Sequence, residues 1–312
     1  MKKPYEFLYD SPPLSVHHEL PENRLYPFAK AQESLYTRFD SASLLSQILN
    51  FRPFYAELLE VNSHSPFRMT YQINEKQHFL FFMLHGSIDF TDTDGLFISH
   101  ARERHYAVTY NDRGLYRVKI SPGRHVALCI SILPEWLAFV SKDLPVLKKY
   151  LTALDAEEYP YAMLPYCRMD LHVLRWLRNI YAEMANGVGS LDGLLRLYIS
   201  RTLERYNVLA AQQLKRMPYR VKDYLDLHFS DANLNSRQVA DYFGMTERTL
   251  RNHFKAEFNI TIRDYYTSCR LRQALILMKI KNLPVSDIYY QVGYNDESTF
   301  RYEMKKFKIR MA

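Results

Sequence analysis

The chain has 312 residues, of which 47% are hydrophobic and 24% are charged. This balance is ordinary for a folded protein, and the length is enough for two domains that each have a core. The longest apolar stretch, residues 126–140, contains Pro134 and Glu135, which excludes a membrane span there. The N-terminus has no signal-peptide core, so we expect a cytoplasmic protein with no membrane partner.

The net charge of +7 is unevenly distributed along the chain. Residues 218–312 hold 16 Lys and Arg against 11 Asp and Glu, whereas residues 1–217 hold 25 against 23. A positive excess near the C-terminus is expected of a domain that approaches phosphates. The three cysteines, Cys129, Cys167 and Cys269, lack metal-ligand or CxxC spacing, and we expect them to be buried thiols.

The first 50 residues carry five prolines among polar residues and show no clear periodicity. They predict an extended arm with a short helix near residues 43–49. Such an arm either folds over a neighbouring domain or is a loose end.

Residues 51–164 have the pattern of a β-rich domain. Short apolar runs alternate with turn signals such as Asp94-Gly95 and Ser121-Pro122-Gly123. The predicted strands are 55–61, 68–73, 78–84, 96–99, 106–110, 115–120 and 126–132. The run HFLFFMLH, at 78–85, is apolar on both faces and is expected to lie in the middle of a sheet. Strands of this length with no helix between them predict a sandwich or a small barrel.

Aromatic and histidine side chains in these strands are candidates for a small-molecule site, because an aromatic barrel mouth can hold a ligand. The candidates are His78, Phe82, Tyr106, Tyr110 and Tyr116. Ordinary core packing is the other explanation for the same residues. The sequence has no His-x-His pair, glycine-rich phosphate loop or paired-carboxylate pattern. We therefore expect no metal, no cofactor and no enzymatic activity.

Residues 165–217 predict a pair of helices, near 167–186 and 191–215, each with an apolar stripe. Two such helices form a helical hairpin. The hairpin is either a dimerisation surface or a cover for the open edge of the β-rich domain.

Residues 236–307 contain one helix-turn-helix pattern twice, which is an internal repeat. In each copy a short apolar helix ends at a glycine, Gly244 or Gly293, that permits a sharp turn. A side-chain acceptor, Thr246 or Asp296, then stands at the N-cap of the next helix. That helix buries two apolar residues at i and i+4 and leaves its other face polar, which suits the major groove of DNA.

A helix predicted over residues 261–280 joins the two copies. At ~1.5 Å per residue it spans roughly 30 Å. Successive major grooves on one face of DNA are roughly 34 Å apart. Two recognition helices joined by this helix are therefore expected to enter successive grooves.

These stretches resemble the DNA-binding domain of AraC/XylS-type bacterial transcription regulators. The matching segments are VADYFGMTERTLRNHFKAEF, YYTSCRLRQALILM and IYYQVGYNDESTFRYEMKKF. The resemblance covers residues 219–307 and implies a seven-helix double helix-turn-helix domain that binds promoter DNA. By position, it implies base-reading roles for Arg248, Arg251, Asn252, Glu297, Ser298, Arg301 and Tyr302. Thr246, Lys255, Lys305 and Lys306 are better placed for phosphates.

The sequence departs from the family pattern in three places. Tyr289 stands where the family usually has a small alanine, and Glu297 is acidic on a helix that faces DNA. Glu297 can accept from cytosine N4 but repels phosphate. After Phe307 the family usually continues with a Gly, a Pro and a closing segment, so either the end is truncated or the last helix is capped differently. We expect the first copy to be the stronger reader of sequence.

The predicted fold class is α+β: a β-rich, cupin-like (jelly-roll) sensor domain, a helical hairpin and an all-α double helix-turn-helix domain. The predicted bounds are 1–50 for the arm, 51–164 for the sensor, 165–217 for the hairpin and 218–312 for the DNA-binding domain. The predicted function is DNA-binding transcription regulation under a small-molecule effector. The predicted partners are promoter DNA, the effector, a second copy in a homodimer, and RNA polymerase. The alternative is a cupin-like ligand-binding protein or enzyme whose helical tail contacts only proteins.

Overall fold

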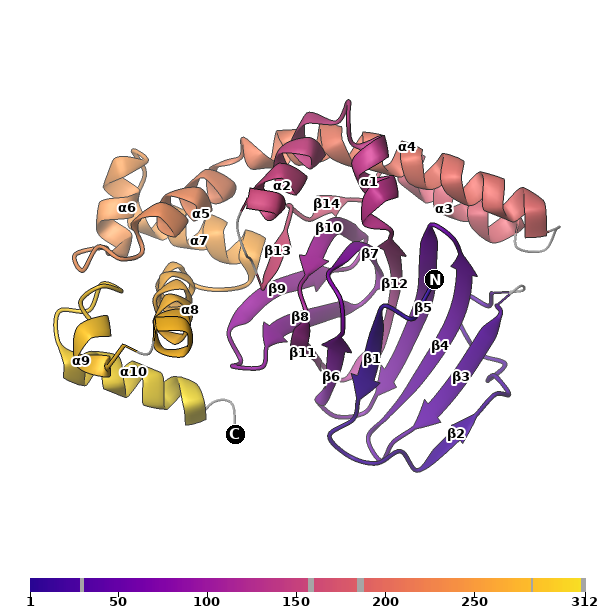
Figure 1. The fold of residues 1–312 in the computed structure, drawn as a ribbon, viewed down its shortest axis with the longest axis horizontal. Helices are drawn as coiled ribbons and strands as arrows, with labels where there is room; N and C mark the ends of the chain where they lie inside the picture. The colour runs from indigo at the N-terminus through magenta and orange to yellow at the C-terminus, as the bar shows by residue number, and fades with distance from the viewer. Residues whose placement is uncertain (29–30, 157–159, 184–187, 282, 310–312) are drawn as a thin grey trace. The chain divides into compact units, whose positions relative to one another are not determined.

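The computed structural model describes residues 1–28, 31–156, 160–183, 188–281 and 283–309 (Figure 1). They form two compact units, Met1–Phe90 with Ala101–Gln213, and Thr91–His100 with Leu214–Ala312. The first unit consists mainly of strands and the second mainly of helices. Among the described residues no helix is both long enough and apolar enough to cross a membrane.

The strands belong to two sheets, whose orders are β1-β6-β11-β8-β9 and β13-β10-β7-β12-β5-β4-β3-β2, with β14 paired to β10. In chain order they are β1 (Tyr5–Leu8), β2 (Ser15–His17), β3 (Glu33–Arg38), β4 (Ala42–Phe51), β5 (Phe54–Ser63), β6 (Phe67–Ile73), β7 (Gln77–His85), β8 (Ser87–Asp92), β9 (Phe97–Arg102), β10 (His105–Asn111), β11 (Gly114–Ile120), β12 (Gly123–Ile132), β13 (Tyr161–Met163) and β14 (Cys167–Arg168).

The helices of the first unit are α1 (Pro134–Val140), α2 (Pro145–Ala156), α3 (Leu171–Glu183) and α4 (Val188–Leu214). Those of the second unit are α5 (Met217–His228), α6 (Ser236–Tyr242), α7 (Glu247–Phe258), α8 (Ile262–Lys281), α9 (Val285–Ile288) and α10 (Glu297–Ile309). The predicted fold class, a β-rich region followed by helices, is confirmed.

The central strand β7 is buried on both faces, as its continuous apolar sequence predicts. Phe82 belongs to one core with Leu203 and Tyr206 of α4, so it lies on the face of the sheet that α4 covers. On the opposite face the Phe79 ring lies 5.9 Å from the ring of Tyr5 in β1, measured between centroids. The sheet is therefore a middle layer between helices on one side and the second sheet on the other.

All seven predicted strands are confirmed, and most extend by one to three residues beyond the predicted ends. The prediction of an arm with a short helix near 43–49 is wrong, because Ala42–Phe51 is the strand β4, paired with β3 and β5. Leu44, Leu45, Ile48 and Leu49 have the spacing of a helix face. A strand buried on both faces gives the same spacing, and only the pairing with distant strands decides between the two.

The helical hairpin predicted over 165–217 is present as α3 and α4, apart from residues 184–187, which lie outside the described residues. Val173 and Ile180 of α3, and Leu195 and Leu203 of α4, join the core of the nine-stranded sheet. The two helices therefore cover that sheet. Their predicted role in dimerisation stays a prediction.

His78, at the start of β7, is a buried histidine with little polar compensation. It is 8% exposed, and its Nδ1 has no hydrogen-bond partner among the described residues. Its ring lies 5.2 Å from that of Tyr110. Burial disfavours the charged imidazolium and lowers the pKa of His78 from 6.5 to about 4.

This depressed pKa predicts acid-dependent loss of stability in the first unit. As the pH falls below 6.5, His78 becomes protonated in the unfolded chain, whereas in the folded chain it stays neutral down to about pH 4. The free energy of unfolding should therefore fall by about 2 kcal/mol more in the wild type than in His78→Phe between pH 7 and pH 5. Urea unfolding followed by the fluorescence of Trp136 and Trp176 measures it, with the exposed His17→Phe as control. Parallel losses in all three proteins would contradict the assignment.

Candidate nucleic-acid interface

The first helix-turn-helix unit consists of α6 and α7. The side chain of Asn235 caps α6 by accepting hydrogen bonds from the backbone N–H groups of Arg237 and Gln238, both at 3.0 Å. Gly244 makes the turn with a φ of +64°. Thr246 then caps α7 by accepting from the N–H of Thr249 at 3.2 Å. The predicted glycine turn and N-cap are confirmed.

The second unit, α9 and α10, repeats this arrangement. Gly293 makes the turn with a φ of +89°. The carboxylate of Asp296 accepts from both the N–H and the hydroxyl of Thr299 at 2.7 Å, and these hydrogen bonds lower the pKa of Asp296. Tyr289, which replaces the small residue expected there, packs partly buried against the core of this unit.

Helix α8 contributes side chains to the cores of both units. Near its N-terminus, Ile262 and Tyr266 pack with Leu250 and Phe254 of α7. Nearer its C-terminus a second set of side chains, Leu271, Ala274 and Leu277, packs with Ile288, Val292, Phe300 and Met304. The predicted helix over 261–280 is confirmed, and it is a shared structural element rather than a spacer alone.

Arg270 lies between these two cores on α8 and is only 7% exposed. Its Nε donates to the carbonyl of Phe229 and its Nη2 to the carbonyl of Asp231, both at 2.7 Å. Its guanidinium carbon lies 4.9 Å from the ring centroid of Tyr266 and 5.3 Å from that of Tyr294. One side chain therefore connects the segment after α5, helix α8 and the second turn.

Gly293 completes this contact from the second unit. A Cβ atom there would lie 2.8 Å from the carbonyl carbon and oxygen of Ser230 and 3.0 Å from the carbonyl oxygen of Phe229. The backbones of the two units thus meet where only glycine fits. We call residues 229–231, Arg270, Gly293 and Tyr294 the joint.

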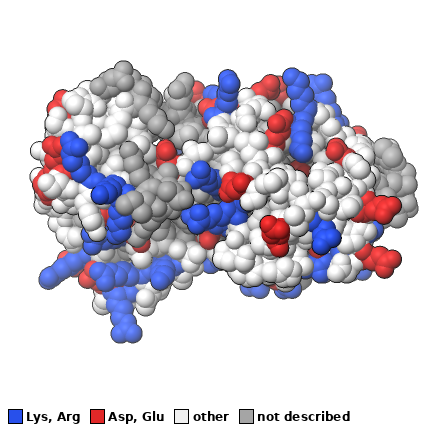
Figure 2. Space-filling view, turned by 90° about the horizontal axis from the view of Figure 1, so that it is seen from below, with Lys and Arg blue, Asp and Glu red and all other residues white. Residues whose placement is uncertain are grey.

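The residues predicted to contact DNA lie on exposed faces of α7 and α10. Leu250 and Phe254 face the core at 1% and 0% exposure, as do Phe300 and Met304 at 1% and 7%. This leaves the remaining predicted contacts at the surface, with Glu297 half-buried: Thr246, Arg248, Arg251, Asn252 and Lys255 on the first unit, and Ser298, Arg301, Tyr302, Lys305 and Lys306 on the second. Figure 2 shows Lys and Arg side chains gathered over one part of the surface, with a few carboxylates among them.

Each recognition helix carries an ion pair between its first residue and an arginine four positions later. Glu247 pairs with Arg251, and the Nε of Arg301 donates to Glu297 at 2.6 Å. A carboxylate at the first position also interacts favourably with the N-terminal end of the helix dipole. Glu247 was not among the predicted site residues, although its i, i+4 spacing to Arg251 is visible in the sequence.

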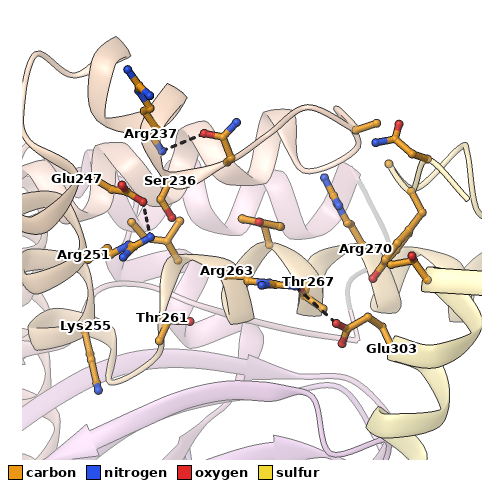
Figure 3. Close-up of a pocket in the computed structure, with 18 of the residues that line it drawn as sticks. Ser236, Arg237, Glu247, Arg251, Lys255, Thr261, Arg263, Thr267, Arg270 and Glu303 are labelled. Carbon is orange, nitrogen blue, oxygen red and sulfur yellow. Dashed lines mark hydrogen bonds and ion pairs between the residues drawn. The ribbon is translucent and has the colours of Figure 1, made fainter.

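A groove of about 750 Å³ lies between the two helix-turn-helix units, along α8 (Figure 3). Of the residues predicted to contact DNA, Arg251, Asn252 and Lys255 line it. The other cationic residues along it are Arg237, Arg263 and Arg270, and Arg263 approaches Glu303 at 4.0 Å. The groove continues the basic surface of α7 toward the second unit.

The five residues predicted to bind a ligand lie in the β-rich unit, within packed regions. Phe82 and Tyr106 stack at 5.4 Å with their planes 3° apart, and His78 contacts Tyr110. Tyr116 lies on the five-stranded sheet and donates to the carbonyl of Asp112 at 2.9 Å. Their role in ligand binding stays a prediction.

The cysteines and metal-ligating residues give no further site in the described part of the chain. Cys129, Cys167 and Cys269 are buried thiols, and burial raises the pKa of Cys269 to about 11. Among the described residues no cluster of three or more His, Cys, Asp or Glu is placed to hold a metal ion.

Residues 239–308 match the family model of a helix-turn-helix domain. Over 145 residues the chain is 28% identical to the HTH-type transcriptional activator RhaS of Escherichia coli, a match that covers 43% of this chain and 50% of that protein. The helical domain is of the AraC/XylS type. The chain spans about half the length of the curated relatives it matches.

Two solved structures are also similar to the chain. The C-terminal domain of AraT, a response regulator from Geobacillus stearothermophilus, is 25% identical with a TM-score of 0.29, covering 31% of this chain and 87% of that one. ToxT from Vibrio cholerae is 13% identical with a TM-score of 0.30, covering 82% of this chain and 94% of that one.

The joint predicts different costs for two glycine substitutions. Gly244→Ala should cost about 1–2 kcal/mol, because only the left-handed backbone is strained and nothing lies within 4 Å of the added Cβ. Gly293→Ala should cost clearly more, because its Cβ also meets the backbone of Ser230. Hydrogen exchange of α8 and α10 peptides measures both. Equal losses of protection would show that the close contact at Gly293 contributes nothing.

Proposed function

We propose that the protein is a sequence-specific DNA-binding transcription regulator whose two recognition helices, α7 and α10, enter successive major grooves. The observation that carries this proposal is the repeated unit itself: two capped helices with basic outer faces, held by one shared helix and one buried arginine. Helix α8 has 20 residues, so at ~1.5 Å per residue its length is close to one turn of DNA.

In this proposal the first helix-turn-helix unit, α6 and α7, supplies the main base contacts. Arg251 and Asn252 project from one turn of α7, where an arginine can pair with guanine O6 and N7 and an asparagine with adenine N6 and N7. Arg248 lies three residues before Arg251 on the same exposed surface. Lys255 lies one turn farther from the helix N-terminus, where it would contact phosphate and contribute equally at every sequence.

The Glu–Arg pairs orient the reading arginines before DNA is bound. An exposed i, i+4 ion pair is worth about 0.3–0.5 kcal/mol, whereas a bidentate arginine–guanine contact discriminates by about 1–3 kcal/mol. Guanine therefore displaces the carboxylate at small cost. Phosphate alone gains less from an arginine that is already paired.

The proposal also covers the β-rich unit, Met1–Phe90 with Ala101–Gln213, and the partners of the protein. The β-rich unit would bind a small-molecule effector. The effector would act only if it binds the DNA-competent state of the protein with a different affinity from the DNA-incompetent state. Helices α3 and α4 would pair two copies through their outer sides, where Leu171 is 80% exposed. A regulator of this kind acts in the cytoplasm and contacts RNA polymerase at the promoter.

Selection of bound sequences from a random DNA pool, at two salt concentrations, tests the proposal. We expect a two-part motif whose halves lie about one helical turn apart, with affinity falling steeply as salt rises. A motif from one half only would mean that the unit around Tyr289 clamps DNA without reading it. No enrichment at either concentration would reject DNA binding and favour a ligand-binding or enzymatic protein with a helical interaction tail.

Two single substitutions separate base reading from phosphate binding. Arg251→Ala should cost about 1–3 kcal/mol on the selected site and relax the preference at one base pair. Lys255→Ala should weaken binding to all sequences alike and reduce the salt slope by about one. Fluorescence anisotropy on matched and single-mismatch duplexes measures both. A uniform loss of affinity in both variants would remove the reading role from Arg251.

A further inference from the structure

A cavity of about 260 Å³ lies in the β-rich unit, where it is lined mainly by residues of β1 from one sheet and of β3, β4 and β5 from the other. None of the five ligand residues predicted from the sequence lines it. At about 30 Å³ per water molecule, the volume equals roughly nine waters. It therefore suits a small molecule of comparable size.

A carboxylate lies at the floor of this cavity. Glu57 of β5 lines the cavity and is 1% exposed. One of its oxygens, Oε1, accepts a hydrogen bond from the Ser46 hydroxyl. The other, Oε2, is buried and has no hydrogen-bond partner among the described residues. A buried carboxylate costs several kcal/mol unless it is paired, so this oxygen is an open position for a donor.

The protein groups around Glu57 do not neutralise it. The hydroxyls of Tyr5 and Tyr55 are also buried, and neither makes a hydrogen bond of good geometry within the described residues. The Tyr5 hydroxyl nevertheless interacts with the Glu57 carboxylate, which contributes to its raised pKa. Burial, reinforced by the charge of Glu57, raises the pKa of both tyrosines and of the Cys129 thiol. All three therefore stay protonated and neutral, and none supplies the missing positive charge.

The walls and rim of the cavity favour a cation. The exposed carboxylates of Glu6 and Glu33 line it with Glu57, against the single ammonium of Lys3. The rings of Phe7 and Tyr9 also line it, and aromatic faces attract cations. Negative charge thus occurs both at the floor and at the rim.

We propose that this cavity binds a small primary amine, whose ammonium group pairs with Glu57 and donates to its open oxygen. A diamine would place its second ammonium near Glu6 and Glu33 at the rim. The site gives a chemical class to the effector and, in that regulatory role, rests on the proposed function. Amine binding itself does not require DNA.

The test measures binding to the full chain without DNA, so failure of amine binding is distinct from failure of DNA binding. The probes are 1,4-diaminobutane, 1-butylamine, 1-butanol and butyrate at constant ionic strength. Melting is followed by the fluorescence of Trp136 and Trp176, and affinity by calorimetric titration. We expect both amines to bind and to raise the melting temperature, the diamine more, and the alcohol and butyrate to do neither.

Three variants locate the binding. Glu57→Gln should lower amine affinity at least tenfold. Glu33→Gln should mainly remove the advantage of the diamine over the monoamine. Glu75→Gln removes an exposed carboxylate outside the cavity and should bind as the wild type does.

The proposal is overturned if the alcohol binds as well as the amines, if neither amine binds, or if Glu57→Gln binds amines as tightly as the wild type. The first outcome would mean that water or a tyrosine hydroxyl satisfies Oε2. If Glu57→Gln does not fold, Glu57→Asp replaces it, since a carboxylate withdrawn by one methylene should still weaken amine binding. The wild-type comparison of amine with alcohol is decisive without any variant.

Discussion

The guanidinium of Arg270 is a full charge removed from water and placed where two helix-turn-helix units meet. Its hydrogen bonds to the carbonyls of Phe229 and Asp231 and its contacts with two tyrosine rings offset the cost of burying it. Both carbonyls lie just after α5, next to the first helix-turn-helix unit, whereas Tyr294 belongs to the second helix-turn-helix unit. Displacing either unit would break a hydrogen bond or a ring contact and leave a buried charge uncompensated.

This arrangement restricts how the two recognition helices, α7 and α10, can move relative to each other. A ~30 Å helix alone fixes a distance between the units but leaves their rotation about its axis free to vary with side-chain packing. The joint adds contacts away from that axis, and the close approach at Gly293 leaves little room for sliding. Binding to two successive grooves then costs less ordering than it would for two units on a flexible linker.

Sequence reasoning succeeded where structure is determined locally. Thr246 and Asp296 could be recognised as caps because their partners lie three residues away, and the glycine turns follow from the same short range. It failed for β4, because the run from Leu44 to Leu49 fits a helix face as well as a strand buried on both sides. The difference lies in pairing with β3 and β5, which no local pattern records.

The interface and the cavity show the same limit at the level of single residues. Arg270 was not predicted because its partners are backbone carbonyls about 40 residues away, and carbonyls have no sequence signature. Glu57 was not predicted because a glutamate within a strand ordinarily marks a solvated face. Here that face meets a second sheet, which includes β1 from the very N-terminus.

The two buried charges differ in how the protein satisfies them, and this difference separates a structural role from a binding role. Two donors of Arg270 meet carbonyls of the chain itself and two tyrosine rings lie beside its guanidinium, so the charge is compensated by the protein and holds the fold together. Glu57 has one hydroxyl partner, neutral neighbours and a cavity beside its open oxygen. If stability alone governed this position, an apolar residue packed into the cavity would serve better than a half-paired carboxylate. The carboxylate and the empty volume beside it are both explained by a ligand that supplies the missing donor and charge.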